Sequence, residues 1–418
     1  MRAEATQTTV LAEPLALPCG LVLPNRIAKT ATGEGLADVW TSDVTQALIG
    51  LYERWAEGGT GTLITGGLSV GRGDNDATTV VLDDRTDLVG LRRWAQAVHR
   101  HDVRLVGQLL HPGRLTPVYV ARHPAAPSVL PPVLGSRMFG SSRALTVEEI
   151  TDLIDRFAAA ALMLQRAGFD GVELHAGFGF LISSFLSPAT NRRTDRWGGD
   201  LQGRSRLLVE IVQALRDRVE PGFAVAVKLG IRDFVPGGFD VDEAAQVAGM
   251  LEAEGVDLIE VCGGTIDSEP ATPDDQPGQP DRKPRQDVLV SLMPRLRAET
   301  HVPLALTGGL HSRSVMERLI GDGTVDLAGM ARPLIRQPDF SARLLDGTAD
   351  SVDTTVEPTD PSLTMLWWSS QIRRVARGTG FDPTYTPRQA EIDAVLGTAR
   401  HVAATLRTRA ADLVGRRH

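Results

Sequence analysis

The chain has only two cysteines in 418 residues, Cys19 and Cys262, and they stand far apart. Two cysteines cannot build a disulfide framework. They also cannot ligate an iron–sulfur cluster, which needs about four. A reduced, cytoplasmic protein is therefore the expected setting.

Long apolar runs and concentrated positive charge are also missing. No window approaches the ~18 uninterrupted apolar residues of a membrane span, and the N-terminal stretch mixes charged residues with threonine, unlike a secretory signal. The net charge of −8 is spread along the chain, without the basic stripe that DNA or RNA binding needs. These absences argue against nucleic acid and membrane as partners. The expected partner is therefore a small-molecule substrate, and the sequence does not decide whether the chain forms a homo-oligomer.

Apolar strands and helical stretches alternate along the chain at a regular spacing, which is typical of βα units and a parallel sheet. Eight strands are expected, at residues 26–31, 61–65, 104–108, 171–175, 223–229, 257–261, 302–306 and 325–329. An open doubly wound sheet could also hold eight strands, but its phosphate signal would follow the first strand. Here the glycine turns come near the end of the strand series. Their position favours a closed α/β fold, the (βα)8 TIM barrel, which is expected to comprise residues 1–346.

Two additions to the barrel are predicted. Residues 15–23 have the pattern of a short hairpin, expected as an N-terminal β-hairpin plug at the barrel bottom. Residues 347–418 are expected to form a C-terminal helical extension in which Trp367 and Trp368 serve packing. A proline-rich connection, residues 112–142, is predicted to form a lid or pocket wall at the catalytic rim.

A histidine stands where a short, largely apolar strand ends. His175 follows residues 171–174, and Thr146 with Glu149 forms a capping box that predicts the helix before this strand. The carboxyl ends of parallel strands are where α/β enzymes place ligands and chemistry. A histidine satisfied within a packed turn explains His175 equally well.

Two turns follow the last two predicted strands: Gly308 and Gly309 after the seventh, Ala331 and Arg332 after the eighth. Loops at these places in barrels commonly bind phosphate. Glycine lets backbone amides approach an anion, and the following helix presents its positive end. Arg332 adds a fixed charge with a forked donor set. The turns therefore predict a phosphate site, and no metal site is expected.

The stretch around His175 resembles the Old Yellow Enzyme family, in its bacterial NADH:flavin oxidoreductase branch. The matching motifs are Leu186-Ser187-Pro188, Asn191-Arg192-Arg193-Thr194-Asp195, Gly198-Gly199 and Arg204. The resemblance extends over about residues 15–340 and is 2,4-dienoyl-CoA reductase-like without the iron–sulfur cluster. It implies a (βα)8 barrel that binds FMN non-covalently and takes NAD(P)H as its reductant.

The resemblance also implies which residues meet the flavin. Gln108 is expected to hydrogen-bond the pyrimidine edge, and Lys228 to place a positive charge near N1 and O2. Lys228 could also pair with Glu173 or Glu260, and the two roles are compatible. The remaining cofactor positions implied by the family pattern are Ala31, Thr32, Gly33, Gly67, Gly308, Gly309, Ala331 and Arg332.

Two positions depart from the family pattern, which usually places a second His or Asn and a Tyr after the first His. Here they are Phe178 and Phe180. The expected substrate site therefore keeps His175 but loses one oxyanion donor and the phenolic proton donor. Tyr119, expected at the rim, is the candidate substitute, and the two phenylalanines would form an apolar floor.

We therefore expect an FMN-dependent oxidoreductase that transfers hydride between NAD(P)H, flavin N5 and a small conjugated carbonyl compound. The missing acid leaves open a flavin-dependent isomerase or an oxidative desaturase of a specialised metabolite. The apolar floor leaves open substrates without an enone. Two further alternatives are a Schiff-base aldolase using Lys228 and a flavin-binding protein without turnover.

Overall fold

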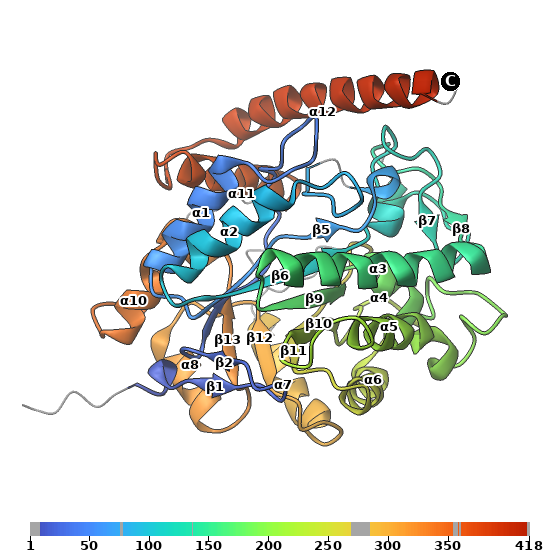
Figure 1. Ribbon diagram of the computed structural model, residues 1–418. Coiled ribbons are helices and arrows are strands. Elements are labelled where there is room, and N and C mark those ends of the chain that lie inside the picture. The colour runs from blue at the N-terminus through green and yellow to red at the C-terminus, as the bar shows by residue number, and fades with distance from the viewer. Residues whose placement is uncertain are drawn as a thin grey trace, which may run out of the picture.

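Eight parallel strands close into a barrel in the computed structural model, which describes residues 9–75, 78–135, 137–268, 285–353, 358 and 361–415 (Figure 1). The strands are β3 (Ile27–Lys29), β4 (Thr62–Ile64), β6 (Arg104–Leu110), β9 (Gly171–Ala176), β10 (Ala224–Gly230), β11 (Leu258–Cys262), β12 (Leu304–Thr307) and β13 (Leu327–Met330). Pairing of β13 with β3 completes the ring. The predicted (βα)8 barrel is confirmed, with each strand within about two residues of its expected bounds.

Helices cover the outside of the barrel (Figure 1). They are α1 (Gln46–Glu57), α2 (Leu88–His99), α3 (Val147–Ala167), α4 (Leu181–Leu186), α5 (Leu201–Arg216), α6 (Val241–Ala253), α7 (Arg285–Arg297), α8 (Arg313–Gly321), α9 (Arg332–Arg336) and α10 (Phe340–Leu345). The predicted capping box begins α3: the Thr146 hydroxyl accepts from the Glu149 N–H at 3.2 Å, and the Glu149 carboxylate accepts from the Thr146 N–H at 2.9 Å. Within the described ranges, no helix combines the length and apolarity that crossing a bilayer requires.

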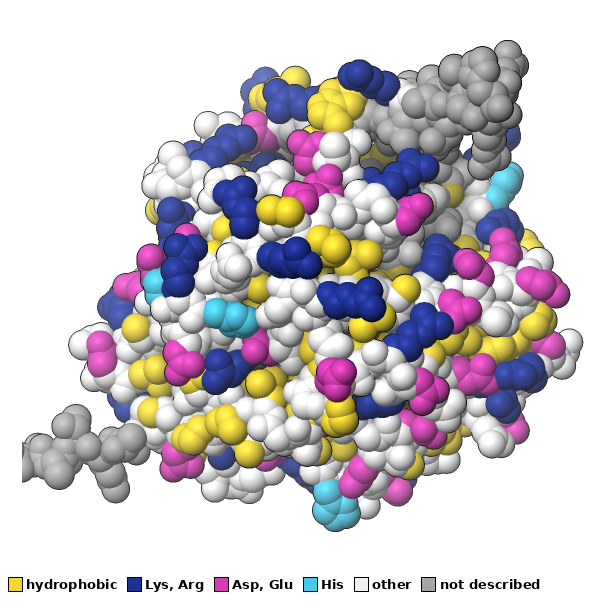
Figure 2. Space-filling model, viewed as in Figure 1, with side chains coloured by type: hydrophobic (Ala, Val, Ile, Leu, Met, Phe, Trp, Pro, Cys, Tyr) yellow, Lys and Arg dark blue, Asp and Glu magenta, His cyan; other side chains and the backbone are white. Residues whose placement is uncertain are grey.

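Short elements complete the layer around the barrel. They are η1 (Val10–Ala12), β5 (Leu68–Ser69), η2 (Arg72–Asp74), η3 (Gly113–Leu115), β7 (Ala125–Ala126), η4 (Val133–Gly135) and β8 (Arg143–Ala144). The parallel pair β7 and β8 lies within the proline-rich connection. Lysine and arginine side chains are interspersed with aspartate and glutamate over the face seen in Figure 2.

The N-terminal hairpin closes the amino end of the barrel. Strands β1 (Leu15–Ala16) and β2 (Val22–Leu23) pair antiparallel, with Leu15 opposite Leu23. Leucines of this hairpin form an apolar cluster with residues near the strand starts, including Ala224, Leu258 and Leu327. The predicted plug is confirmed, and it leaves the carboxyl ends of the strands for the site.

Two helices follow the barrel at the C-terminal end: α11 (Pro361–Ala376) and α12 (Pro387–Gly415). Trp367 and Trp368 are buried, and the Trp367 indole N–H donates to the Tyr385 carbonyl at 2.6 Å. The Arg54 guanidinium of α1 donates to the Val375 carbonyl of α11. The tryptophans therefore serve packing, as expected, whereas the division of the chain at residue 346 stays a prediction.

Candidate active site

Three of the predicted site residues come together at the carboxyl ends of neighbouring strands. Gln108 lies on β6, His175 on β9 and Lys228 on β10, and all three are buried. The register places Lys228 beside His175 across β9 and β10. The parallel sheet therefore brings together residues up to 120 positions apart in the sequence. They meet at the carboxyl ends of the strands, where barrel enzymes place their catalytic residues.

Two fully buried carboxylates bind Gln108 and Lys228. The Gln108 amide N–H donates to Glu173 Oε1 at 2.7 Å, and Lys228 Nζ donates to Glu260 Oε1 at 2.5 Å. Pairing of Lys228 with a buried carboxylate, one of the two roles expected for it, is thus present. The hydrogen bond between Gln108 and Glu173 was not among the predictions from the sequence. The place of Glu173 two residues before His175, on the same strand face, was the available signal.

The two carboxylates differ in protonation. Burial raises the pKa of Glu173 well above its ordinary value, and the nearby charge of Glu260 adds to this. Burial would also raise the pKa of Glu260, but the charge of Lys228 and a hydrogen bond with Glu173 lower it overall. The Oε2 atoms of both carboxylates lack a conventional donor among the described residues. One proton held by Glu173 and shared with Glu260 satisfies both oxygens.

His175 is a neutral imidazole with a defined tautomer. Burial lowers its pKa well below the ordinary value, and the charge of Lys228 acts in the same direction. The Gly177 N–H donates to His175 Nδ1 at 3.3 Å. Because Nδ1 is the acceptor, the ring proton lies on Nε2. His175 therefore offers one N–H donor to a substrate oxygen.

Phe180 packs against His175, and Phe178 packs against Phe180, so two apolar rings stand where the family pattern has a donor and an acid. The Phe180 ring centroid is 4.7 Å from that of His175 and 5.9 Å from that of Phe178. Phe178 has φ 61°, in the left-handed region, and 37% of its surface is exposed. The Ile266 N–H donates to the Phe178 carbonyl at 3.2 Å, which holds this backbone in place.

The two predicted glycine turns are neighbours in space. Thr307, at the end of β12, pairs with Gly329 of β13. Gly308 and Gly309 have φ 123° and 74°, a backbone that only glycine adopts readily. A Cβ at Gly329 would lie 2.3 Å from Thr307 Oγ1. Close packing of small residues thus brings the ends of β12 and β13 side by side, so the two turns leave neighbouring strands, an arrangement that fits a phosphate group.

Ala331 and Arg332 complete this end of the site. Ala331 immediately precedes α9, and Arg332 is its first residue. The arrangement therefore contains the residue types that the phosphate of FMN requires: glycine backbone, a helix start and a cation.

The loops after β3 and β4 are fixed by a buried cluster that sequence analysis did not single out. Lys29 Nζ donates to Glu34 Oε1 at 2.8 Å and to the Tyr52 hydroxyl at 3.1 Å. The Thr32 hydroxyl donates to the same Glu34 oxygen at 2.9 Å, and the Gly66 N–H donates to the Tyr52 oxygen at 3.0 Å. The cluster therefore ties the predicted flavin-facing loops to α1. A lysine inside the apolar run 26–31 was the available signal.

The remaining predicted positions lie on the loops after β3, β4 and β6. Ala31 and Gly33 belong to the loop after β3, and a Cβ at Gly33 would meet nothing within 4 Å. A Cβ at Gly67 would lie 2.5 Å from the Leu110 side chain, so packing requires a small residue there. Tyr119 lies half-buried in the connection after β6. The described residues contain no group of three His, Cys, Asp or Glu side chains that could hold a metal ion.

The closed barrel, the adjacent late turns and the buried Lys228 beside His175 fit a barrel enzyme that binds a phosphate-bearing cofactor. Comparison with known proteins identifies the family, because the model of the NADH:flavin oxidoreductase / NADH oxidase family matches residues 11–351. This chain belongs to that family. It is an FMN-dependent oxidoreductase that binds FMN non-covalently and uses NAD(P)H.

Individual relatives agree with this assignment. The chain is 32% identical over 348 residues to the NADH-dependent flavin oxidoreductase iliE of Hypocrea jecorina (strain QM6a), covering 78% of this chain and 86% of the relative. It is 34% identical over 354 residues to the NADH-dependent flavin oxidoreductase iccE of Talaromyces variabilis, covering 78% and 84%. The structure of morphinone reductase in complex with tetrahydroNAD matches with a TM-score of 0.67 at 26% identity, covering 85% of this chain and 93% of that one.

Proposed function

We propose that this enzyme reduces a small conjugated carbonyl compound, and that position 180 takes no part in delivering the proton. The observation that carries the proposal is the pairing of a neutral His175 with the Phe180 ring, 4.7 Å away. His175 can bind the carbonyl oxygen of the substrate, and the neighbouring Phe180 has no exchangeable hydrogen to donate. A cytoplasmic setting and a homo-oligomer stay predictions.

The cofactor positions follow from the same geometry. Gln108 and Lys228, each fixed by a buried carboxylate, would hold the pyrimidine end of FMN. The turns at 308–309 and 331–332 would hold its phosphate. Held by these residues, FMN would supply hydride transfer from NAD(P)H to the substrate. Since Glu260 already pairs with Lys228, the positive charge offered to the flavin is partly compensated within the protein.

His175 would act as an oxyanion donor through Nε2–H. A carbonyl oxygen that gains negative charge is stabilised by a donor already aimed at it. With Phe178 in place of a second donor, one hydrogen bond is lost, and losing one such donor typically costs on the order of 3 kcal/mol of transition-state stabilisation. Substrates activated by a second electron-withdrawing group would tolerate this loss best. The proton must then come from water or from Tyr119.

A second candidate function is isomerisation or oxidative desaturation. Isomerisation is favoured by Phe180, because a missing acid penalises proton transfer at the α-carbon and leaves hydride transfer and its return unaffected. Oxidative desaturation would need another base to remove the α-proton. A Schiff-base aldolase is disfavoured. Burial alone would lower the pKa of Lys228, but the charge of Glu260 raises it above the ordinary value, whereas a nucleophilic lysine needs a lowered pKa.

The test is anaerobic. NADH-reduced, FMN-loaded protein is mixed with cyclohex-2-enone and the flavin absorption band is followed. Return of the oxidised band with formation of cyclohexanone supports reduction, and a His175→Ala variant should be slowed by about 10²-fold or more. Failure of every activated alkene to reoxidise the flavin would remove reduction as the function. Double-bond migration in a deconjugated enone, without net NADH consumption, would favour the isomerase.

A further inference from the structure

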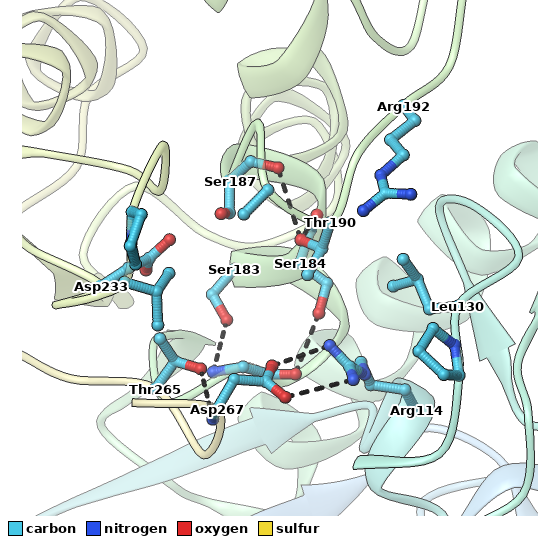
Figure 3. Close-up of a pocket in the computed structure, with 15 residues that line it drawn as sticks. Arg114, Leu130, Ser183, Ser184, Ser187, Thr190, Arg192, Asp233, Thr265 and Asp267 are labelled. Atoms are coloured by element: carbon cyan, nitrogen blue, oxygen red, sulfur yellow. Dashed lines mark hydrogen bonds and ion pairs between the residues drawn. The ribbon is translucent and has the colours of Figure 1, made fainter. Parts of the chain in front are cut away.

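A largely apolar pocket of about 230 Å³, with charged and hydroxyl side chains in its lining, borders the loop that carries the two phenylalanines (Figure 3). Gly179, between Phe178 and Phe180, lines this pocket, as does Thr265, which pairs with Phe178. The other walls come from α4 and the segment after it, and from the loops after β6, β10 and β11. The pocket therefore adjoins the predicted substrate site.

Arg192 supplies a cation to this pocket. Among the described residues no ion pair or side-chain hydrogen bond is made by its guanidinium, which extends toward the pocket in Figure 3. The second arginine of the lining, Arg114, differs: it is buried and donates to both oxygens of Asp267, at 2.7 and 3.2 Å. Because Arg114 and Asp267 neutralise each other, Arg192 is the cation left for a ligand anion.

Asp233 supplies an anion from the opposite side of the pocket (Figure 3). Its Oδ2 accepts from the Phe239 N–H at 2.8 Å, and within the described part of the chain no cation pairs with it. Burial raises the pKa of Asp233; hydrogen bonds from Ser187 and from the Phe239 N–H oppose this, and the charges of Asp267 and Glu243 add to it. A positively charged ligand group beside Asp233 would relieve both effects.

The hydroxyl groups of the lining present oxygens more than hydrogens. Ser183 donates to the Gly177 carbonyl at 3.0 Å, Ser184 to the Gly179 carbonyl at 2.9 Å, and Thr190 to the Ser184 carbonyl at 2.7 Å. With their hydrogens engaged, these side chains are acceptors for a ligand donor. The remaining wall is apolar and consists of Leu130, Pro131, Val235, Pro236 and Ala189.

We propose that this pocket binds the remote end of the substrate, a group that carries both a carboxylate and an ammonium. The carboxylate lies on Arg192, and the ammonium lies between Asp233 and the hydroxyl oxygens. A group with only one of the two charges would leave either the cation or the anion of the pocket without a partner. The inference rests on the proposed function in one respect, that the reacting end of the same substrate lies at His175.

The binding test uses FMN-loaded protein and three probes of matched length: 5-aminopentanoate, pentanoate and pentylamine. Isothermal titration should give the aminopentanoate about tenfold or more tighter binding than either single-charge probe, since charge-assisted hydrogen bonds are worth about that factor. Arg192→Gln should weaken aminopentanoate and pentanoate about tenfold and spare pentylamine. Asp233→Asn, which keeps an acceptor for Phe239, should weaken aminopentanoate and pentylamine and spare pentanoate.

Arg196→Gln is the matched control, because Arg196 is an exposed arginine of the same segment that pairs with Glu210 outside the pocket. It should leave all three affinities unchanged. Equal affinity for the three probes, or no response to Arg192→Gln and Asp233→Asn, overturns the inference. If cyclohex-2-enone still reoxidises the flavin in that case, the pocket assignment alone has failed. Charge-selective binding without any enone reduction would instead leave the pocket and remove the proposed function.

Discussion

Phe178 provides a test of how the loop after β9 is built. Its φ of 61° lies in the left-handed region, where a side chain with a Cβ is strained. Replacing it by Ala and by Gly removes the phenyl ring in both cases, so the loss of ring contacts cancels between the two variants. What remains is the difference between a backbone with a Cβ and one without.

The expected size of that difference follows from two opposing terms. A left-handed residue with a Cβ costs roughly 1–2 kcal/mol. Glycine costs about 0.5–1 kcal/mol more than alanine through the conformational entropy of the unfolded chain. The Gly variant should therefore exceed the Ala variant in stability by about 0.5–1 kcal/mol, the reverse of the usual order.

Thermal unfolding followed by tryptophan fluorescence, with FMN at the same saturating concentration, measures this order; the expected difference in Tm is about 0.5–1 °C for a chain of this length. Phe178→Asn should match Gly in stability, because asparagine tolerates this conformation. It should also strengthen binding of a carbonyl ligand by adding a donor beside His175. An Ala variant as stable as the Gly variant would refute the strain argument.

Three further predictions concern buried titratable side chains. Lys29→Met should destabilise the protein by roughly 3–5 kcal/mol in denaturant unfolding, because it leaves the Glu34 carboxylate buried and unpaired. Adding Glu34→Gln to this variant should restore part of the lost stability. A double variant no more stable than Lys29→Met would argue against the ion pair. The raised pKa of Glu173 means that its contribution to stability is complete below its ordinary value of 4.5 and is lost as pH rises through the raised pKa. The wild-type advantage over Glu173→Gln should accordingly shrink as pH rises, and a constant difference would count against a protonated Glu173. The pKa of His175 is lowered, so its contribution to stability is present above pH 6.5 and is lost as pH falls through the lowered pKa. Ring ¹⁵N NMR should show a neutral imidazole at pH 6. A protonation transition near pH 6.5 would contradict the burial of His175 beside Lys228.

The barrel could be predicted from the sequence because its signals are local. Apolar strands, the capping box at Thr146 and the left-handed glycines at 308 and 309 each depend on neighbouring residues. The strand order then follows from the regular alternation of strands and helices. The placement of His175 at a strand end follows from the same pattern.

The supports of the site could not be predicted because they depend on strand register and on helix packing. Gln108 and Glu173 are 65 residues apart and meet only because β6 and β9 pair in one particular register. Lys29 meets Tyr52 only because α1 packs against β4, the strand next to β3. The sequence pattern also gave no sign that the phenylalanine at 178 adopts a left-handed backbone.

The most direct test of the central claim is the rate at which cyclohex-2-enone reoxidises the NADH-reduced flavin in the wild type and in Phe180→Tyr, with Phe180→Leu as the control of similar size. A phenol beside His175 would supply the acid that the wild type lacks, and a placed general acid contributes about 10²–10⁴-fold. The account predicts that Phe180→Tyr accelerates reoxidation at least tenfold, by the conservative end of that range, while Phe180→Leu stays at the wild-type rate. Equal rates in all three proteins would contradict it.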